Sequence, residues 1–302
     1  MDETRKQYAR KKLAEMNLID DFLFTEIMSD EKDGAAVCSM ILSCVLKREV
    51  KSIKFEAQKV IHGVSEQSHG IRLDVYVTGK PGADGDSEED YSVYDVEVDN
   101  RPGNKGGIPK RSRYYGSLID AKFLEPRKGY TELPDIFTIF ILSYDPFDQN
   151  ALYYEAGTHL LTHPDVPYDD GIRRIYLYTK GELPGNAGED DRKLRNLLRY
   201  INESTEANVI DDNTRRLDEI VRVTKTKGTV EDDIVYNWER DEELKEEARA
   251  EERVNTERER KRADDAEKRA DDEKKRADGA VNELNAAKER IAELEAALAG
   301  KK

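Results

Sequence analysis

The sequence predicts an α/β domain followed by a long C-terminal coiled-coil helix, and three observations support this prediction. Short alternating or continuous apolar runs predict strands, and longer amphipathic stretches between them predict helices. Beyond residue 238 the sequence instead repeats every seven residues, with almost no large apolar residue before Leu284. Overall, 37% of the residues are hydrophobic and 38% are charged, which is typical of a folded domain joined to a much more polar segment.

The expected elements follow from apolar spacing. Residues 137–143 (FTIFILS) form a nearly all-apolar run, which predicts a buried central strand. The Gly-, Pro- and acid-rich segment 79–90 predicts a turn that joins two strands into a hairpin. We expect helices over 2–28, 34–47, 109–124, 189–203 and 211–224, and strands over 50–60, 71–77, 91–99, 137–143, 153–161 and 172–178. The predicted parts are a core domain at 1–182, a helical extension at 183–238 and the coiled coil at 239–302.

The net charge of −15 disfavours a general nucleic-acid binder, because phosphate contacts need Lys and Arg. No apolar run is long enough for a transmembrane helix, and the charged N-terminus does not resemble a secretory signal. Cys38 and Cys44 lie in an apolar helical stretch, where we expect reduced core residues. We therefore expect a cytoplasmic protein with no membrane partner.

The C-terminal segment contains tandem heptads, RADDAEK, RADDEKK and RADGAVN, at 262–282. One seam position holds Ala263, Ala270, Ala277, Leu284, Ile291 and Leu298, and the other holds Ala266, Glu273, Ala280, Ala287 and Leu294. This a/d pattern predicts a homo-oligomeric coiled coil over 239–298, dimeric or trimeric. The alternative is a lone charged helix stabilised by ion pairs between neighbouring turns.

Acidic residues cluster on the predicted hairpin. Alternation places Asp95, Glu97 and Asp99 on one face of their strand, and matching register would bring Asp74 of the neighbouring strand opposite Glu97. Carboxylates this close repel, and a shared cation relieves that repulsion. Oxygen ligands without His or Cys favour Mg²⁺ or Mn²⁺. The alternative is an ordinary exposed strand face in an acidic protein.

The charge changes sign directly after these acids. Residues 100–119 contain no Asp or Glu. Five basic residues lie there instead, followed by Tyr114 and Tyr115; they are Arg101, Lys105, Lys110, Arg111 and Arg113. Helical spacing places Arg111, Tyr114 and Tyr115 on one face, where they could hold a phosphate backbone and stack on bases. Equally, the basic residues could neutralise the acid cluster while the tyrosines enter the core.

At these residues the chain resembles the PD-(D/E)XK nuclease family transposases. The resemblance covers about residues 18–180 and is carried by several motifs in order. These are the opening helix LIDDFLF (18–24), the LDV strand (73–75), YDVE (94–97), IPKRSRYY (108–115), Gly129-Tyr130, Leu133-Pro134 and the apolar strand 136–142.

The resemblance implies a restriction-endonuclease-like mixed sheet flanked by helices and Mg²⁺-dependent cleavage of DNA phosphodiesters. Asp74 and Glu97 would hold the metal, with the carbonyl of Val98 as a candidate third ligand, and Arg111 and Arg113 would lie near the scissile phosphate. The sequence departs from the motif at Asp99, where the family has Lys or often Gln. An Asp could bind a second cation or act as a general base, so Asp99 is the third predicted catalytic residue. Lys59, Lys105 or Lys110 are candidates to supply the missing positive charge.

Three hypotheses follow. The first is a metal-dependent DNA endonuclease of transposase type that oligomerises through its tail. The second is a catalytically inactive nuclease fold used as a DNA-binding or protein-interaction scaffold, favoured by Asp99 and by the acidic core. The third is a coiled-coil adaptor with a globular head of unrelated purpose.

Overall fold

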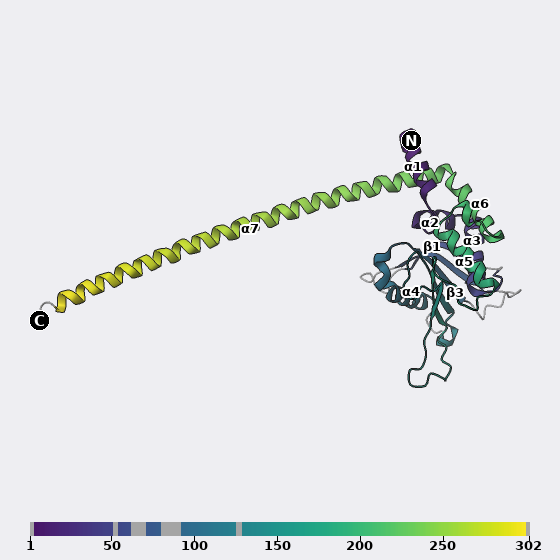
Figure 1. The fold of residues 1–302 in the computed structure, drawn as a ribbon, viewed down its shortest axis with the longest axis horizontal. Coiled ribbons are helices and arrows are strands. Elements are labelled where there is room, and N and C mark those ends of the chain that lie inside the picture. The colour runs from purple at the N-terminus through teal and green to yellow at the C-terminus, as the bar shows by residue number, and fades with distance from the viewer. Residues whose placement is uncertain (1–2, 51–53, 62–70, 80–91, 125–128, 300–302) are drawn as a thin grey trace. The chain divides into compact units, whose positions relative to one another are not determined.

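The computed structural model describes residues 3–50, 54–61, 71–79, 92–124 and 129–299 (Figure 1). Its contacts divide the chain into two compact units, Met1–Val235 and Tyr236–Lys302. The first unit contains a six-stranded sheet with helices on both faces, and the second is a continuation of a long helix. The mixed α/β class with a long C-terminal helix is therefore confirmed, whereas the predicted limits at 182 and 238 remain predictions.

The sheet has the strand order β1-β2-β3-β4-β6-β5. Its strands are β1 (Lys54–Ile61), β2 (Ile71–Gly79), β3 (Ser92–Asp99), β4 (Asp135–Leu142), β5 (Tyr153–Ala156) and β6 (Ile172–Tyr178). The pairs β1–β2, β2–β3 and β5–β6 are antiparallel, and the central pairs β3–β4 and β4–β6 are parallel. The predicted β2–β3 neighbours and the buried central strand are thus present, because the apolar run of β4 is covered on both faces.

Two layers of helices cover the sheet. The helices are α1 (Glu3–Glu15), α2 (Asp21–Met28), α3 (Glu31–Leu46), α4 (Ile108–Phe123), α5 (Glu189–Asn202), α6 (Asp212–Lys225) and α7 (Gly228–Ala299), with short 3₁₀ turns η1 (Pro102–Gly107), η2 (Tyr130–Glu132) and η3 (Glu206–Asn208). Apolar residues of α2, α3, α5 and α6 form the largest core cluster with one face of β3, β4 and β6. Helix α4 packs on the other face, through Leu118 and Ile119 against Val93 and Ile136.

The N-terminal helical stretch differs from the expectation. The prediction of a single helix over 2–28 is wrong, because α1 ends at Glu15 and α2 begins at Asp21. Between them, the backbone amide of Asn17 donates to Asp20 Oδ2 over 2.8 Å, and Asp20 is extended. Such a side chain–backbone hydrogen bond competes with helix formation. The strand expected over 153–161 also ends early, at Ala156.

Helix α7 runs without a break for 72 residues. Its first turns belong to the globular unit, where Val230, Ile234 and Val235 pack with Ala9 and Leu13 of α1. Residues 244–295 are exposed throughout. Among the described helices, none combines the length and the apolar character needed to cross a membrane.

Candidate active site

Strand β3 presents a row of buried acids. Asp95 and Glu97 are 0% exposed and Asp99 is 2% exposed. They alternate with Tyr94, Val96 and Val98, which enter the largest core on the opposite face. The alternative of an ordinary exposed acidic face is therefore wrong. Carboxylates are rarely fully buried without a compensating charge, so this row needs one.

Strand β2 brings Asp74 to the same level of the sheet. Val75 pairs with Val96 and Tyr76 pairs with Asp95, so one further step in the same antiparallel register places Asp74 opposite Glu97. The Asp74 side chain lies outside the described part of the chain. Lys59 pairs with Leu73, the residue before Asp74 in β2. Because successive positions of a strand alternate between the two faces of the sheet, the register sets Lys59 and Asp74 at positions on opposite faces.

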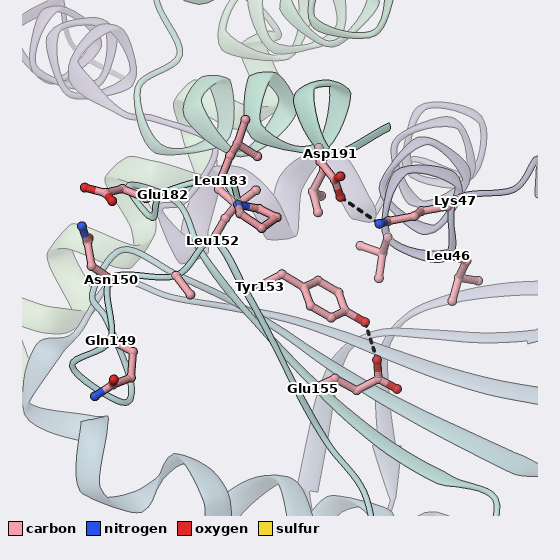
Figure 2. A pocket seen from close by; sticks show the side chains of 14 residues that line it. Leu46, Lys47, Gln149, Asn150, Leu152, Tyr153, Glu155, Glu182, Leu183 and Asp191 are labelled. Atoms are coloured by element: carbon pink, nitrogen blue, oxygen red, sulfur yellow. Dashed lines mark hydrogen bonds and ion pairs between the residues drawn. The ribbon is translucent and has the colours of Figure 1, made fainter. Parts of the chain in front are cut away.

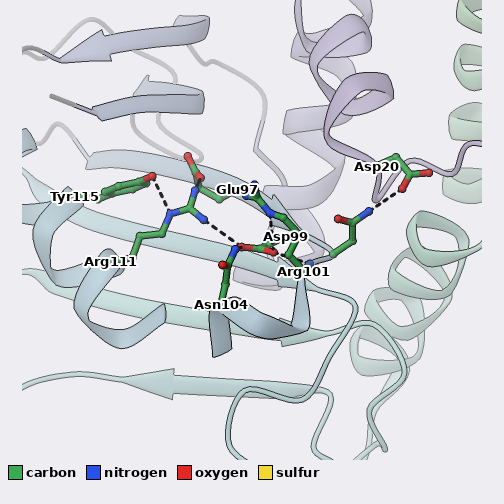
Figure 3. A network of polar contacts seen from close by, with 8 residues as sticks. Asp20, Glu97, Asp99, Arg101, Asn104, Arg111 and Tyr115 are labelled. Carbon is green, nitrogen blue, oxygen red and sulfur yellow. Dashed lines mark hydrogen bonds and ion pairs between the residues drawn. The ribbon is translucent and has the colours of Figure 1, made fainter. Parts of the chain in front are cut away.

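Arg111 of α4 supplies the compensating charge (Figure 3). Its guanidinium forms an ion pair with Glu97 Oε2, and its Nη1 donates to Asp99 Oδ2 over 3.2 Å. The guanidinium carbon lies 5.1 Å from the ring centre of Tyr115 and 5.3 Å from that of Phe140. One planar cation thus spans two buried carboxylates and rests against two aromatic rings, a role for which Arg is better suited than Lys.

The electrostatics of this contact reinforce the charged states. Burial by itself lowers the pKa of Arg111, but the charge of Glu97, the contact with Tyr115 and the charge of Asp99 together outweigh this effect, so the pKa is raised. Arg111 Nε donates to the Tyr115 hydroxyl over 2.8 Å. Burial, followed by the negative charge of Glu97, raises the pKa of Tyr115 to about 12, so its phenol stays protonated at neutral pH.

Asp99 accepts hydrogen bonds from the loop that follows β3. Its Oδ1 accepts from the backbone amide of Arg101 over 2.8 Å, and its Oδ2 accepts from Asn104 Nδ2 over 2.8 Å and from Arg111. Three donors therefore hold this carboxylate in place. These contacts show what Asp99 does at the position where the resemblance implies Lys or Gln: it anchors the start of η1 and shares Arg111 with Glu97.

The predicted basic and aromatic residues of α4 separate into two sets. Arg111 and Tyr115 face the sheet, whereas Lys110, Arg113 and Tyr114 are exposed. Tyr115 contacts the Arg111 guanidinium, whereas Tyr114 is 37% exposed, and whether Tyr114 shares a binding face with them remains a prediction. Neutralisation of the acids by the following segment is confirmed for Arg111. Lys105 instead forms an ion pair with Asp148.

Sequence reasoning missed several residues of this network. Asn100 Nδ2 donates to Asp20 Oδ1 over 2.7 Å, which ties the end of β3 to the start of α2 (Figure 3). Ser112 and Tyr176 share a buried hydrogen bond of 2.8 Å beneath α4. Tyr144, 8% exposed, follows β4, and burial followed by the charge of Asp99 raises its pKa to about 12. For the loop contacts, the available signal was the presence of Asn100 and Asn104 in a Gly/Pro loop directly after an acidic strand.

The donor set agrees with a hard divalent cation. Glu97 and Asp95 offer only oxygen, as does Asp74 at the register position opposite Glu97, and oxygen ligands select Mg²⁺, Mn²⁺ or Ca²⁺. Positive charge already lies at the Asp99 end of the row, where Arg111 pairs with Glu97 and Asp99 and Arg101 Nε lies 3.6 Å from Asp99 Oδ1. Within the described side chains, which do not include that of Asp74, no group of three His, Cys, Asp or Glu is arranged around a metal position.

A separate cleft of about 590 Å³ lies at the β5 edge of the sheet (Figure 2). It is bordered by the end of α3, the start of α5 and the strand β5, with Lys47 Nζ 2.8 Å from Asp191 Oδ1 across its rim. Tyr153 donates to Glu155 over 2.9 Å on its floor. None of the predicted site residues lines this cleft, so it is distinct from the acidic row.

The geometry defines an α/β protein with adjacent acidic strands and an arginine held against them. A family model described as PD-(D/E)XK nuclease family transposase matches residues 18–280. The chain therefore belongs to the PD-(D/E)XK nuclease family transposases. The match extends beyond the predicted 18–180 into α7. Neither a curated protein nor a solved structure matches the chain significantly.

Membership of this family supports a nuclease- or transposase-like function, and it suggests DNA as the substrate. Nucleases of this class generally use divalent metal ions.

Proposed function

We propose that the chain is a divalent-metal-dependent DNA endonuclease whose reaction centre is formed by Asp74 and Glu97, with Mg²⁺ or Mn²⁺ as the cofactor. The observation that carries this proposal is the complete burial of Glu97 beside a guanidinium, at the position that the strand register sets opposite Asp74. A protein keeps an unfavourable cluster of buried carboxylates where function requires it.

The side chains have distinct roles in this proposal. Glu97 and Asp74 are the residues that hold the ion, which when bound supplies a hydroxide-like nucleophile and stabilises charge on the phosphate. Arg111 fixes the orientation of the Glu97 carboxylate from the α4 side. In this proposal Lys110 and Arg113, which are exposed, bind the DNA backbone, and the exposed Tyr114 stacks on a base.

Asp99 was a predicted catalytic residue, and that role remains a prediction. Its hydrogen bonds to Arg101 and Asn104 favour a structural role in the β3–η1 connection. In that case the active site lacks the motif Lys, and Arg111 is the nearest described cation to Glu97.

The proposal is tested by plasmid nicking with the purified full-length protein in Mg²⁺ and in Mn²⁺. We expect metal-dependent nicking that Asp74→Asn and Glu97→Gln each reduce to background. Both substitutions keep the size of the side chain and remove its charge. Asp191→Asn is the matched control, because Asp191 is an acid of the separate cleft, and it should leave nicking unchanged. Equal nicking by all four proteins would contradict the assignment.

A second candidate function is an inactive nuclease fold that binds DNA. It is favoured by Asp99, whose carboxylate is held by three donors at the motif Lys position. The same samples distinguish the two functions in a gel-shift assay. Retained DNA binding without nicking in either metal favours the scaffold, and the substitution pair Lys110→Ala and Arg113→Ala should then weaken the shift and reduce its salt dependence.

The tail is the proposed site of homo-oligomerisation, over residues 239–298. Truncation after Trp238 is expected to lower the mass measured by light scattering to that of one globular unit. An unchanged ratio of measured mass to chain mass would exclude the tail as the oligomerisation element.

A further inference from the structure

The second unit presents a stripe of exposed apolar side chains. Val281, Leu284, Ile291 and Leu294 are between 53% and 56% exposed along α7. Monomeric helices seldom keep large aliphatic residues in water at a regular spacing. A partner surface that repeats with the same spacing is therefore expected to cover them.

The spacing of the stripe is that of a coiled-coil seam. Leu284 and Ile291 are seven residues apart at position a, and Leu294 lies three residues further at position d. Ile at a followed by Leu at d favours a two-stranded arrangement. The seam continues towards the globular unit with alanines at a.

The helix surface also carries a hollow of the corresponding kind. A shallow depression is lined by Arg262, Asp265 and four residues that surround it at positions d, g, a and d, namely Ala266, Arg269, Ala270 and Glu273. A coiled coil receives each knob of its partner in a hole formed by four residues of this kind. The small alanines at its centre leave room for a close approach between two helices.

The charges beside the seam agree with a parallel pair. In a parallel pair, each g residue faces the e residue five positions later on the partner. Arg262 then faces Glu267, Glu283 faces Lys288, and Arg290 faces Glu295, so three of the five pairs have opposite charge. Arg269 facing Lys274 is a like-charge pair, and Arg276 faces the uncharged Val281.

The distribution of apolar residues favours the same orientation. The large seam residues Leu284, Ile291, Leu294 and Leu298 are all near the C-terminal end of the helix. A fully overlapped antiparallel pair would set them against the partner's residues 242–259, whose seam positions are Glu242, Lys245, Arg249, Glu252, Thr256 and Glu259. Among pairs that overlap along the length of the helix, a parallel in-register alignment places the apolar ends together.

We infer that residues 262–298 pair with the same residues of a second copy of this chain in a parallel, in-register, two-stranded coiled coil. Both chains then enter the coiled coil from the same end. This inference rests on the tail alone and does not depend on whether the globular unit cleaves DNA.

Parallel in-register pairing has a signature at Glu273. This residue occupies a d position between alanines, so it faces Glu273 of the second copy. Two carboxylates at one seam level repel. Replacing one of them by a lysine turns repulsion into attraction, but only where the two chains are in register.

The test begins with a cysteine scan in the full-length protein. Ala277→Cys is expected to form a disulfide-linked dimer under glutathione buffer, because facing seam positions are within disulfide reach. Asp278→Cys, one residue away on the outer face, is the matched control and should remain largely unlinked. The natural Cys38 and Cys44 are buried and are expected to stay unreacted.

The second arm mixes wild-type protein with Glu273→Lys protein. Heterodimers should exceed the statistical half of the mixture, and light scattering should give the mass of two chains throughout. A dimer that does not crosslink through Ala277→Cys and shows no heterodimer preference would overturn the orientation and register. A monomer or trimer mass for the wild type would overturn the two-stranded pairing.

Discussion

Strand β3 and helix α7 are both rich in acidic residues, but these residues are buried in β3 and exposed along most of α7. The acids of β3 are at most 2% exposed and two of them share one arginine. The acids of α7 after residue 244 lie in water, and pairs such as Glu293 with Arg290, at 3.0 Å, span a single turn. Burial, rather than the number of charges, therefore decides where a charge has large energetic consequences.

The physical reason is the cost of desolvation. A buried carboxylate loses its hydration and needs partners of good geometry, whereas an exposed ion pair replaces water contacts of nearly equal strength. The stability of the β3 site therefore depends strongly on individual ion-pair and hydrogen-bond partners, whereas no single ion pair of the tail is expected to matter much. Four sets of substitutions test this difference, from the largest expected effect to the smallest.

Removing the shared cation is expected to have the largest effect. Arg111→Ala leaves Glu97 and Asp99 buried without it, and breaking a buried pair in this way costs about 3–5 kcal/mol. Urea unfolding followed by circular dichroism measures the loss. The stability of Arg111→Lys should lie between those of the wild type and Arg111→Ala. A lysine keeps the charge but cannot bridge both carboxylates as a planar guanidinium does.

The matched control for that substitution is Arg113→Ala, two residues along the same helix and exposed. It should change the free energy of unfolding by less than about 0.5 kcal/mol. Similar losses for the two arginines would show that Arg111 is not the partner of the buried acids.

Restoring the motif residue is the second test. Asp99→Lys places a cation beside Arg111 and removes the acceptor of the Arg101 amide and of Asn104. We expect it to lower the free energy of unfolding by about 3 kcal/mol and not to increase nicking. Faster nicking by a stable Asp99→Lys protein would show that the position is catalytic.

A helix cap of the globular unit gives an intermediate effect that depends on pH. Asp211 accepts from the Thr214 amide over 2.9 Å at the start of α6. Burial by itself raises the pKa of Asp211, but the hydrogen bonds from Thr214 and Asn196 hold it below the usual value of 3.8. A depressed pKa stabilises the fold above pH 3.8, and the contribution is lost as the pH falls further.

Asp211→Ala should therefore cost about 1 kcal/mol at neutral pH. Asp211→Asn keeps a capping side chain, so it should be more stable than the alanine variant while losing the pH-dependent part. Denaturation midpoints measured at pH 7 and at pH 3 check both statements. A larger loss for Asp211→Ala at pH 3 than at pH 7 would reverse the assigned sign.

The smallest effect is expected in the tail. Glu242 pairs with Lys245 over 2.8 Å on the surface of α7. Exposed pairs of this kind contribute little, so Glu242→Gln should leave the thermal midpoint of the globular unit unchanged. A measurable shift would mean that surface charges of α7 do contribute to the stability of that unit.

The fold was largely predictable from local sequence pattern. The apolar run of β4 and the alternation of β3 specify buried and two-faced strands, and the heptads specify a continuous helix. The break after α1 was missed because it depends on the contact between Asn17 and Asp20 rather than on apolar spacing. The early end of β5 was missed because tyrosines and leucines in a loop resemble a strand.

The candidate site was predictable only in part. The alternation of Asp95, Glu97 and Asp99 follows from strand geometry, and their common face is present. Their burial was not predictable, because it results from α4 packing on that face of the sheet. The partition of Arg111 from Tyr114 depends on the rotation of that helix, which the core contacts of Leu118 and Ile119 determine.

The proposed metal site requires both Glu97 and Asp74, and Mn²⁺ binding followed by electron paramagnetic resonance tests this requirement without cleavage. Titrating Mn²⁺ into the full-length protein should show one bound ion per chain that is lost in Asp74→Asn and in Glu97→Gln but kept in Asp191→Asn. Unchanged Mn²⁺ binding in the first two variants would contradict the metal site and, with it, the proposed reaction centre.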